Sequence, residues 1–257
     1  MEHVRYEKKG RIAYVTMNRP EVMNALHPPA NEELSQVWDD YAADPDVWVA
    51  ILTGAGEKAF SAGNDLKYTA QHGIAAVAMP AGGFAGLTSR FDLFKPIVAA
   101  VNGLALGGGF EIALACDIIV AADHARFGLP EPKVGLAALA GGIHRLPRHI
   151  PMKLAMGMML TGKHVTAAEG QTLGFVNESV PGPQLLAAAE RWANEILACS
   201  PTSVRATKQA ALLGLGLPVE QAMSQSYSLI SELFRSEDMM EGVTAFAQKR
   251  PPQWKGK

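Results

Sequence analysis

Cysteine is scarce in this chain, which has only Cys116 and Cys199 among its 257 residues. Two cysteines cannot build the disulfide framework of a small extracellular protein, so we expect a reducing compartment such as the cytoplasm. The first twenty residues are charged and lack the apolar stretch of a secretion signal. The apolar-rich segment 97–115 is interrupted by Asn102, by glycines and by Glu111. We therefore predict no membrane span and no membrane partner.

Charge of one sign is also lacking. The formal net charge is only -2 and there is no long basic run, so nucleic acid is not expected as a main partner. The sequence has no GxSxG, HExxH or CxxC motif, and its seven histidines show no spacing typical of a metal site. Hydrophobic residues make up 48% of the chain, which is ordinary for a folded protein and argues against disorder.

The first half of the chain alternates patterns of strand and helix. Residues 47–53 (VWVAILT) are a nearly continuous apolar run, typical of a strand buried on both faces. Residues 97–102 and 118–122 repeat this type, which predicts an α/β core. The other elements expected here are a hairpin arm at 11–17, a helix at 31–43 that Asp44-Pro45 ends, and a short helix at 107–116.

Helical patterns dominate after Pro147. We expect a short strand near 175–180 and helices over residues 152–160, 183–198, 202–213 and 219–234. The segment 71–86 is rich in Ala and Gly and has no steady period. It is interpreted either as a mobile loop beside a site or as a plain surface loop.

A triple glycine stands between the predicted strand at 97–102 and the helix that follows it. Glycines let a substrate approach the backbone closely, and the first N–H groups of a helix have no partner within it. The helix dipole also favours negative charge there, so Gly107-Gly108-Gly109 could form an oxyanion site with Glu111 on the first turn. The alternative is a tight packing turn in which Glu111 merely favours the helix N-terminus.

Two further segments carry candidate groups. The turn Gly63-Asn64-Asp65 follows a predicted strand and could present a second N–H, or it could be an ordinary turn in which Asp65 caps the next helix. We expect Asp65 to be scaffold. Glu131 lies between Pro130 and Pro132, which would hold its carboxylate rigidly; the alternative is an exposed loop glutamate.

Together these segments make the chain resemble the crotonase (enoyl-CoA hydratase/isomerase) superfamily. Within it, the sequence is most similar to the carnitinyl-CoA dehydratase branch. The motifs that carry the family resemblance run in order from Asn18-Arg19-Pro20 and Ala25-Leu26 through AGNDL (62–66), AAVNGLALGGGFE (99–111), ACDIIVAA (115–122), FGLPE (127–131), Gly141-Gly142 and RLPR (145–148) to FAQKR (246–250). The branch is suggested by GGFAGLT (82–88), GFE (109–111) and the tail with SED (236–238) and WKG (254–256).

The resemblance implies an α/β fold with a crotonase-like spiral of ββα turns over residues 1–195. It implies a helical C-terminal region over 196–257 that mediates trimer assembly, so a homotrimer or a dimer of trimers is expected. It also implies an acyl-CoA thioester substrate and hydration or dehydration across its C2=C3 bond. No metal is expected, and no cofactor other than the coenzyme A that the substrate carries.

By position, the resemblance places an oxyanion hole on the backbone N–H groups of Asn64 and Gly108. It places the two catalytic carboxyls on Glu111 and Glu131. The CoA adenine would contact the backbone of Ala62 and Leu66, and Lys67 would reach the phosphates. Lys249 would close on CoA from the C-terminal segment, either in the same chain or from a neighbouring subunit.

Leu139 departs from the family pattern, because many hydratases have a glycine beside the catalytic water at this position. The carnitinyl branch is expected to be polar there, so Leu139 argues against carnitine as the acyl group. Three alternatives stay open: a double-bond isomerase on the same scaffold, a catalytically idle acyl-CoA-binding protein, and an RNA-binding protein. Intact Glu111 and Glu131 speak against the second, and the lack of a basic run speaks against the third.

Overall fold

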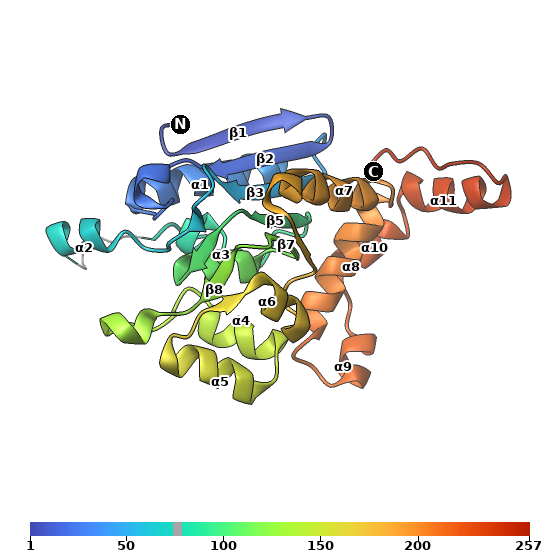
Figure 1. The fold of residues 1–257 in the computed structure, drawn as a ribbon. Helices are drawn as coiled ribbons and strands as arrows, with labels where there is room; N and C mark the ends of the chain where they lie inside the picture. The colour runs from blue at the N-terminus through green and yellow to red at the C-terminus, as the bar shows by residue number, and fades with distance from the viewer. Residues whose placement is uncertain (74–78) are drawn as a thin grey trace.

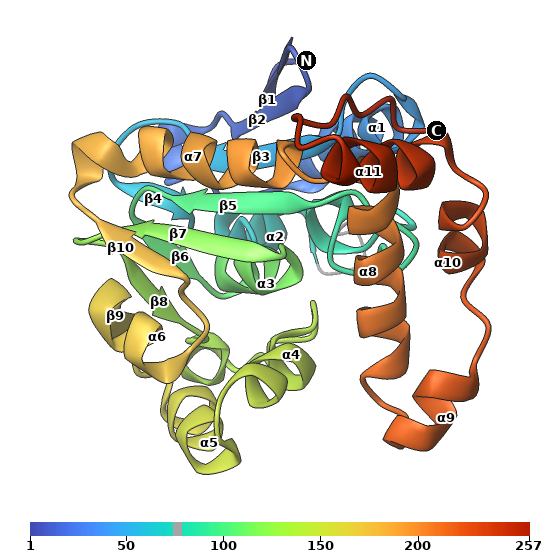
Figure 2. The same cartoon turned by 90° about the vertical axis from the view of Figure 1, so that its right-hand side faces the viewer.

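A six-stranded sheet forms the upper layer of the molecule (Figures 1 and 2). The computed structural model describes residues 1–73 and 79–257. Strands β1 (Val4–Lys9) and β2 (Ile12–Met17) form an antiparallel hairpin, as the sequence predicts. From β2 onward the sheet is parallel, in the order β2, β3 (Val49–Gly54), β5 (Ile97–Val101), β7 (Ile118–Ala122) and β10 (Glu178–Val180).

A second, four-stranded sheet accompanies the first, and its last two strands lie below the first sheet in Figure 2. Its order is β4 (Ala59–Ser61), β6 (Leu104–Leu106), β8 (Arg126–Gly128) and β9 (Val165–Thr166), and only β9 is antiparallel to its neighbour. Each of β3, β5 and β7 is followed by a short strand of this second sheet and then by a helical turn. This repetition is the predicted spiral of ββα units.

Helices cover both faces of the large sheet. On one face, α7 (Leu185–Leu197) packs its small side chains onto β3, β5 and β7. On the other face lie α3 (Gly108–Ala115) and α1 (Pro28–Ala43), whose Trp38 and Tyr41 are fully buried. Strand β5 is buried along its whole length because it is covered on both sides.

The structure describes further helical elements. They are α2 (Leu66–His72), α4 (Gly142–His149), α5 (Met152–Thr161) and α6 (Ala167–Leu173), with short 3₁₀ turns at Pro20–Val22, Phe84–Gly86, Glu131–Val134 and Gly182–Gln184. The C-terminal helices α8 (Pro201–Gly214), α9 (Val219–Ser224), α10 (Ser228–Leu233) and α11 (Glu237–Ala247) stand beside the two sheets rather than on them (Figures 1 and 2). In the part of the chain that the structure describes, no helix is both long and apolar enough to cross a membrane.

Several sequence predictions need correction. The predicted helix 219–234 is wrong as one element, because the chain becomes extended at Gln225 and Tyr227 and separates α9 from α10. Helix α11 was not predicted. Helix α1 begins three residues before the predicted start because prolines are tolerated in the first turn of a helix. The predicted boundary between 195 and 196 falls in the last turn of α7, and the division into two regions stays a prediction.

The predicted loop 71–86 is only partly described, since residues 74–78 lie outside the described residues. Residues 71 and 72 belong to α2. Residues 84–86 form a buried turn packed against α1, so the interpretation as a mobile or surface loop is wrong for them.

Candidate active site

The N-terminus of α3 is built from the triple glycine. Gly107 has φ +55° and ψ -126°, a conformation that only glycine adopts readily, and this turns β6 directly into the helix. The N–H groups of Phe110 and Glu111 donate to the Gly107 carbonyl at 2.9 and 3.0 Å. The Gly108 N–H has no hydrogen-bond acceptor within residues 1–73 and 79–257, so it is free to bind an external acceptor.

A second free amide lies on the turn at Asn64. The Leu26 N–H donates to the Gly63 carbonyl at 2.8 Å, and the Asp65 N–H donates to the Leu26 carbonyl at 2.9 Å. The Asn64 N–H between them has no acceptor among the described residues. A Cβ atom on Gly63 would lie 2.8 Å from the Gly108 nitrogen, so the two turns are in direct contact. The structure thus brings the Asn64 and Gly108 turns together.

Glu111 is almost completely buried on the first turn of α3, with 3% of its surface exposed. Its Oε1 accepts the N–H of Gly142, the first residue of α4, at 2.8 Å. The pKa of Glu111 is raised to about 7, chiefly by burial and in smaller part by the nearby charge of Glu131, while the Gly142 hydrogen bond and the Arg145 guanidinium oppose the rise. A carboxyl with such a pKa can exchange protons near neutral pH.

Glu131 lies at the same end of α3. Its Oε1 is 3.0 Å from the position that a Cβ atom on Gly107 would occupy. The side chain is half-buried, and burial raises its pKa. Its Oε2 is buried and has no hydrogen-bond partner in the described chain, so an acceptor is available there for water or substrate. Glu131 is therefore not the exposed loop glutamate of the alternative interpretation.

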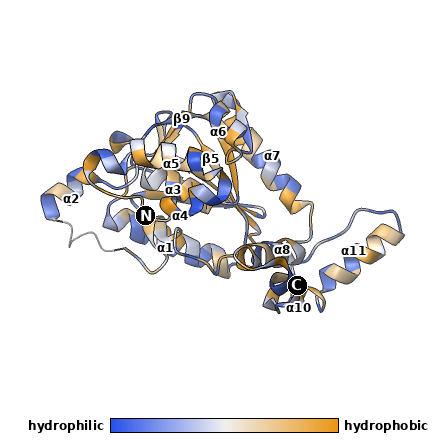
Figure 3. Ribbon diagram, turned by 90° about the horizontal axis from the view of Figure 1, so that it is seen from below, coloured by the Kyte–Doolittle hydropathy of each residue, from blue (hydrophilic) through white to orange (hydrophobic). Residues whose placement is uncertain are grey.

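The residues predicted to bind CoA are less closely grouped. Ala62 is half-buried beside the Asn64 turn, and Leu66 and Lys67 are exposed at the start of α2. Leu139 is 78% exposed. Lys249 follows α11, which lies at the opposite end of the molecule from α2 (Figures 1 and 3), so the structure does not bring it to this site within one chain.

Asp65 has the scaffold position that we expected. Its side chain accepts the Tyr68 N–H at 3.1 Å, which caps α2, and pairs with Arg19 at 3.0 Å.

Phe84 was not predicted from the sequence as a residue of the site, although it packs on Gly108. The pair Gly82-Gly83 was the available signal, because it marks a sharp turn before an aromatic residue.

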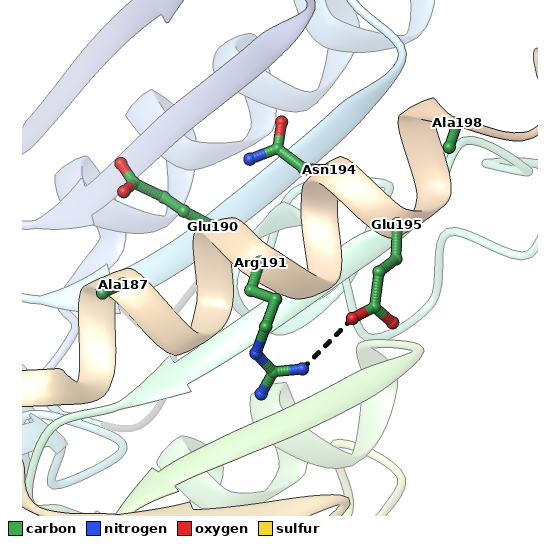
Figure 4. Close-up of a pocket in the computed structure, with 6 residues that line it drawn as sticks. All are labelled: Ala187, Glu190, Arg191, Asn194, Glu195 and Ala198. Atoms are coloured by element: carbon green, nitrogen blue, oxygen red, sulfur yellow. Dashed lines mark hydrogen bonds and ion pairs between the residues drawn. The ribbon is translucent and has the colours of Figure 1, made fainter.

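A shallow hollow on the outward face of α7 holds none of these residues (Figure 4). Its charged side chains pair locally, with Arg191 bonded to Glu195 at 3.2 Å. The hollow is lined by Ala187, Glu190, Arg191, Asn194, Glu195 and Ala198. Outside residues 74–78, no three His, Cys, Asp or Glu side chains are grouped to hold a metal ion.

Comparison with known proteins adds independent findings. The sequence model of the family described as enoyl-CoA hydratase/isomerase matches residues 7–257. The chain is 42% identical over 253 residues to (E)-benzylidenesuccinyl-CoA hydratase of Thauera aromatica, covering 98% of this chain and 99% of the relative. It is 41% identical over 260 residues to carnitinyl-CoA dehydratase of Escherichia coli (strain K12), covering 100% of this chain and 99% of the relative. A crystal structure of an enoyl-CoA hydratase from Mycobacterium marinum superposes with a TM-score of 0.92 at 40% identity, covering 100% of both chains.

Proposed function

Because this chain belongs to the enoyl-CoA hydratase/isomerase family, we propose that it adds water across the C2=C3 bond of an enoyl-CoA thioester, or removes it in the reverse reaction. One observation carries this proposal: two free backbone amides, at Asn64 and Gly108, adjoin the buried carboxyl of Glu111 and the half-buried carboxyl of Glu131 at the same end of α3. Two relatives are named a hydratase and a dehydratase, which are the two directions of such a reaction.

The two amides would bind the thioester carbonyl oxygen. As an enolate forms, negative charge develops on this oxygen, and donors already in place stabilise it without reorganisation. The positive end of the α3 dipole acts in the same direction. One such donor typically contributes about 3–4 kcal/mol to the transition state.

The two carboxyls would divide the proton transfers. Ionised Glu111 takes a proton from water as the water oxygen bonds to C3, and protonated Glu131 gives its proton to C2. A proton then passes from Glu111 to Glu131, which restores the starting ionisation of both groups. Burial raises the pKa of both carboxyls, which favours proton uptake by each of them, and the pKa of about 7 lets Glu111 gain and lose a proton near neutral pH. The reaction as proposed requires no cofactor beyond the CoA of the substrate.

Substrate binding and assembly belong to the same proposal. Ala62, Leu66 and Lys67 would hold the CoA nucleotide, with Lys249 supplied by another copy of the chain.

A homotrimer or a dimer of trimers is supported by large apolar side chains that α8 to α11 and their connections leave exposed. These are Leu212, Leu213, Leu215, Val219, Met223, Phe234, Met240, Val243 and Phe246. Sedimentation of the purified chain measures the assembly. The cytoplasm stays the proposed compartment because Cys116 and Cys199 are free thiols.

The test is a panel of 2-enoyl-CoA substrates of graded chain length, followed by the loss of enoyl thioester absorbance. (E)-Benzylidenesuccinyl-CoA belongs in this panel, whereas carnitinyl-CoA, which a dehydratase consumes, is assayed in the direction of dehydration by the gain of enoyl thioester absorbance. Failure to hydrate any of them, or to dehydrate their hydrated forms, would refute the proposal.

A double-bond isomerase is the second candidate. The observation that favours it is Leu139, an apolar residue where many hydratases have glycine beside the water. A 3-enoyl-CoA assayed beside its 2-enoyl isomer separates the two, since only an isomerase uses the 3-enoyl compound without adding water.

A further inference from the structure

The turn Phe84–Gly86 is held by two buried side chains of α1. The Ala85 N–H donates to Asn31 Oδ1 at 2.7 Å, and the Ala85 carbonyl accepts from Trp38 Nε1 at 3.0 Å. Asn31 and Trp38 are both fully buried. Both backbone polar groups of Ala85 are therefore satisfied by one helix, from residues about fifty positions earlier in the chain.

The backbone of this turn is unusual. Ala85 has φ +55° and ψ 20°, in the left-handed region that disfavours residues with a Cβ atom. Gly86 lies so close to α1 that a Cβ atom there would be 2.4 Å from the Ser35 Cα. Such conformations persist only where their surroundings hold them, and they cluster at functional sites. The two α1 hydrogen bonds and the Gly86–Ser35 contact hold this one.

The turn directs Phe84 onto Gly108. A Cβ atom on Gly108 would lie 2.5 Å from Cε1 and 2.8 Å from Cζ of the Phe84 ring, so the ring fills the place of a side chain at this residue. Phe84 is 4% exposed. Gly108 also touches the turn of Gly63 through its backbone nitrogen. Gly108 is thus packed against both an aromatic ring and a backbone turn.

We infer that Phe84 is a positioning residue for the Gly108 amide, and that Asn31 and Trp38 act through Ala85 to hold the ring in place. This rests on the proposed function, because the Gly108 amide must bind a thioester carbonyl. A hydrogen bond weakens steeply as its donor turns away from the acceptor, so a Gly108 amide free to rock would polarise the carbonyl less. Substrate would still bind through its CoA portion.

The test measures carbonyl polarisation directly. A 4-dimethylaminocinnamoyl-CoA thioester absorbs at longer wavelength when its carbonyl is polarised, and the full-length wild-type chain should produce this shift. In Phe84→Leu and Asn31→Leu we expect less than about half of the wild-type shift, with the Kd of the probe within about threefold. For 2-enoyl-CoA hydration, kcat should fall at least about tenfold while KM changes little, as expected for an interaction made in the transition state.

Matched variants separate positioning from folding. Asn31→Asp keeps an acceptor oxygen for the Ala85 N–H and should restore most of the shift. Phe91→Leu removes the same ring from the same connection at a position that is 72% exposed, and it should keep the wild-type shift of the probe. If Phe84→Leu does not fold, Phe84→Met takes its place, because methionine adapts to irregular space.

The outcomes are distinguishable. Folded Phe84 and Asn31 variants that keep the full wild-type shift would overturn this inference and leave the proposed function intact. A wild-type chain that binds the probe without any shift would overturn the proposed function, and the inference with it.

Discussion

Replacing Glu111 by glutamine should abolish hydration and at the same time stabilise the folded chain at pH 8. Glutamine keeps the size of the side chain and the oxygen that accepts the Gly142 N–H. It removes only the charge and the proton transfer. Loss of a general base typically costs about 100-fold or more in rate, and we expect at least that loss for 2-enoyl-CoA hydration.

The gain in stability follows from the pKa of Glu111. Burial raises this pKa from 4.5 to about 7, which means that the folded chain binds the proton more tightly than the unfolded chain does. Between about pH 4.5 and pH 7, Glu111 is already ionised in the unfolded chain but still protonated in the folded chain. The folded chain therefore loses stability as the pH rises through this range. The rise corresponds to about 3 kcal/mol above pH 7, as an upper estimate. For a chain of this size, that is about 6 °C in Tm.

Thermal unfolding of wild type and Glu111→Gln at pH 5 and pH 8, beside hydration assays, measures both effects. The Tm difference between the two proteins should be small at pH 5 and larger at pH 8. An equal difference at both pH values would contradict the burial argument. Wild-type hydration by Glu111→Gln would refute the mechanism and move the isomerase ahead. The double variant with Glu131→Gln should be scarcely slower than the poorer single variant, because the groups act together.

Four other outcomes are expected. Glu131→Gln should lower hydration about 100-fold and abolish exchange of the substrate C2 proton with deuterated solvent, whereas Glu111→Gln should leave some exchange; unchanged exchange in Glu131→Gln would exclude it as the C2 acid. Gly108→Val should cut kcat at least about 100-fold, because the Cβ atom of the valine would lie 2.5 Å from the Phe84 ring and crowd the amide; assembly should be kept. Full activity in a folded variant would exclude the oxyanion role. Free CoA at 100 times its Kd should stabilise the chain by about 2.7 kcal/mol in thermal unfolding, and no effect at millimolar CoA would argue against thioester binding. Arg145→Met should raise the pKa of Glu111, because the positive charge of Arg145 lowers it. The rise of kcat/KM with pH on the acid side of its profile should then move to higher pH, and an unchanged profile would exclude this electrostatic contribution.

Local patterns in the sequence were sufficient for much of the core. Apolar runs predicted β3, β5 and β7 to within about two residues, because strands buried on both faces need apolar side chains throughout. The triple glycine and the apolar residues after it predicted α3, with Glu111 on its first turn. Such features depend on residues that are close together in the chain, so they can be read without knowing the fold.

The weaker predictions concern segments whose structure depends on distant partners. Residues 84–86 have no helical or strand period, yet Asn31 and Trp38 hold them in a buried turn. The separation of α9 from α10 falls at residues 225–227 (QSY), in a run without the glycine or proline that usually marks a helix end, so the local pattern did not reveal it.

The candidate site shows the same division. The sequence by itself determined which residues are the candidates for chemistry: two glutamates, and two glycine-rich turns that could present free N–H groups. Only the tertiary structure decided that the Gly142 amide meets Glu111 from 31 residues away, that the Asn64 and Gly108 turns touch, and that Lys249 lies far from both. Secondary structure depends mainly on residues that are neighbours in the chain. The contacts within the site depend instead on how the two sheets and their helices pack together, and no local sequence pattern determines that packing.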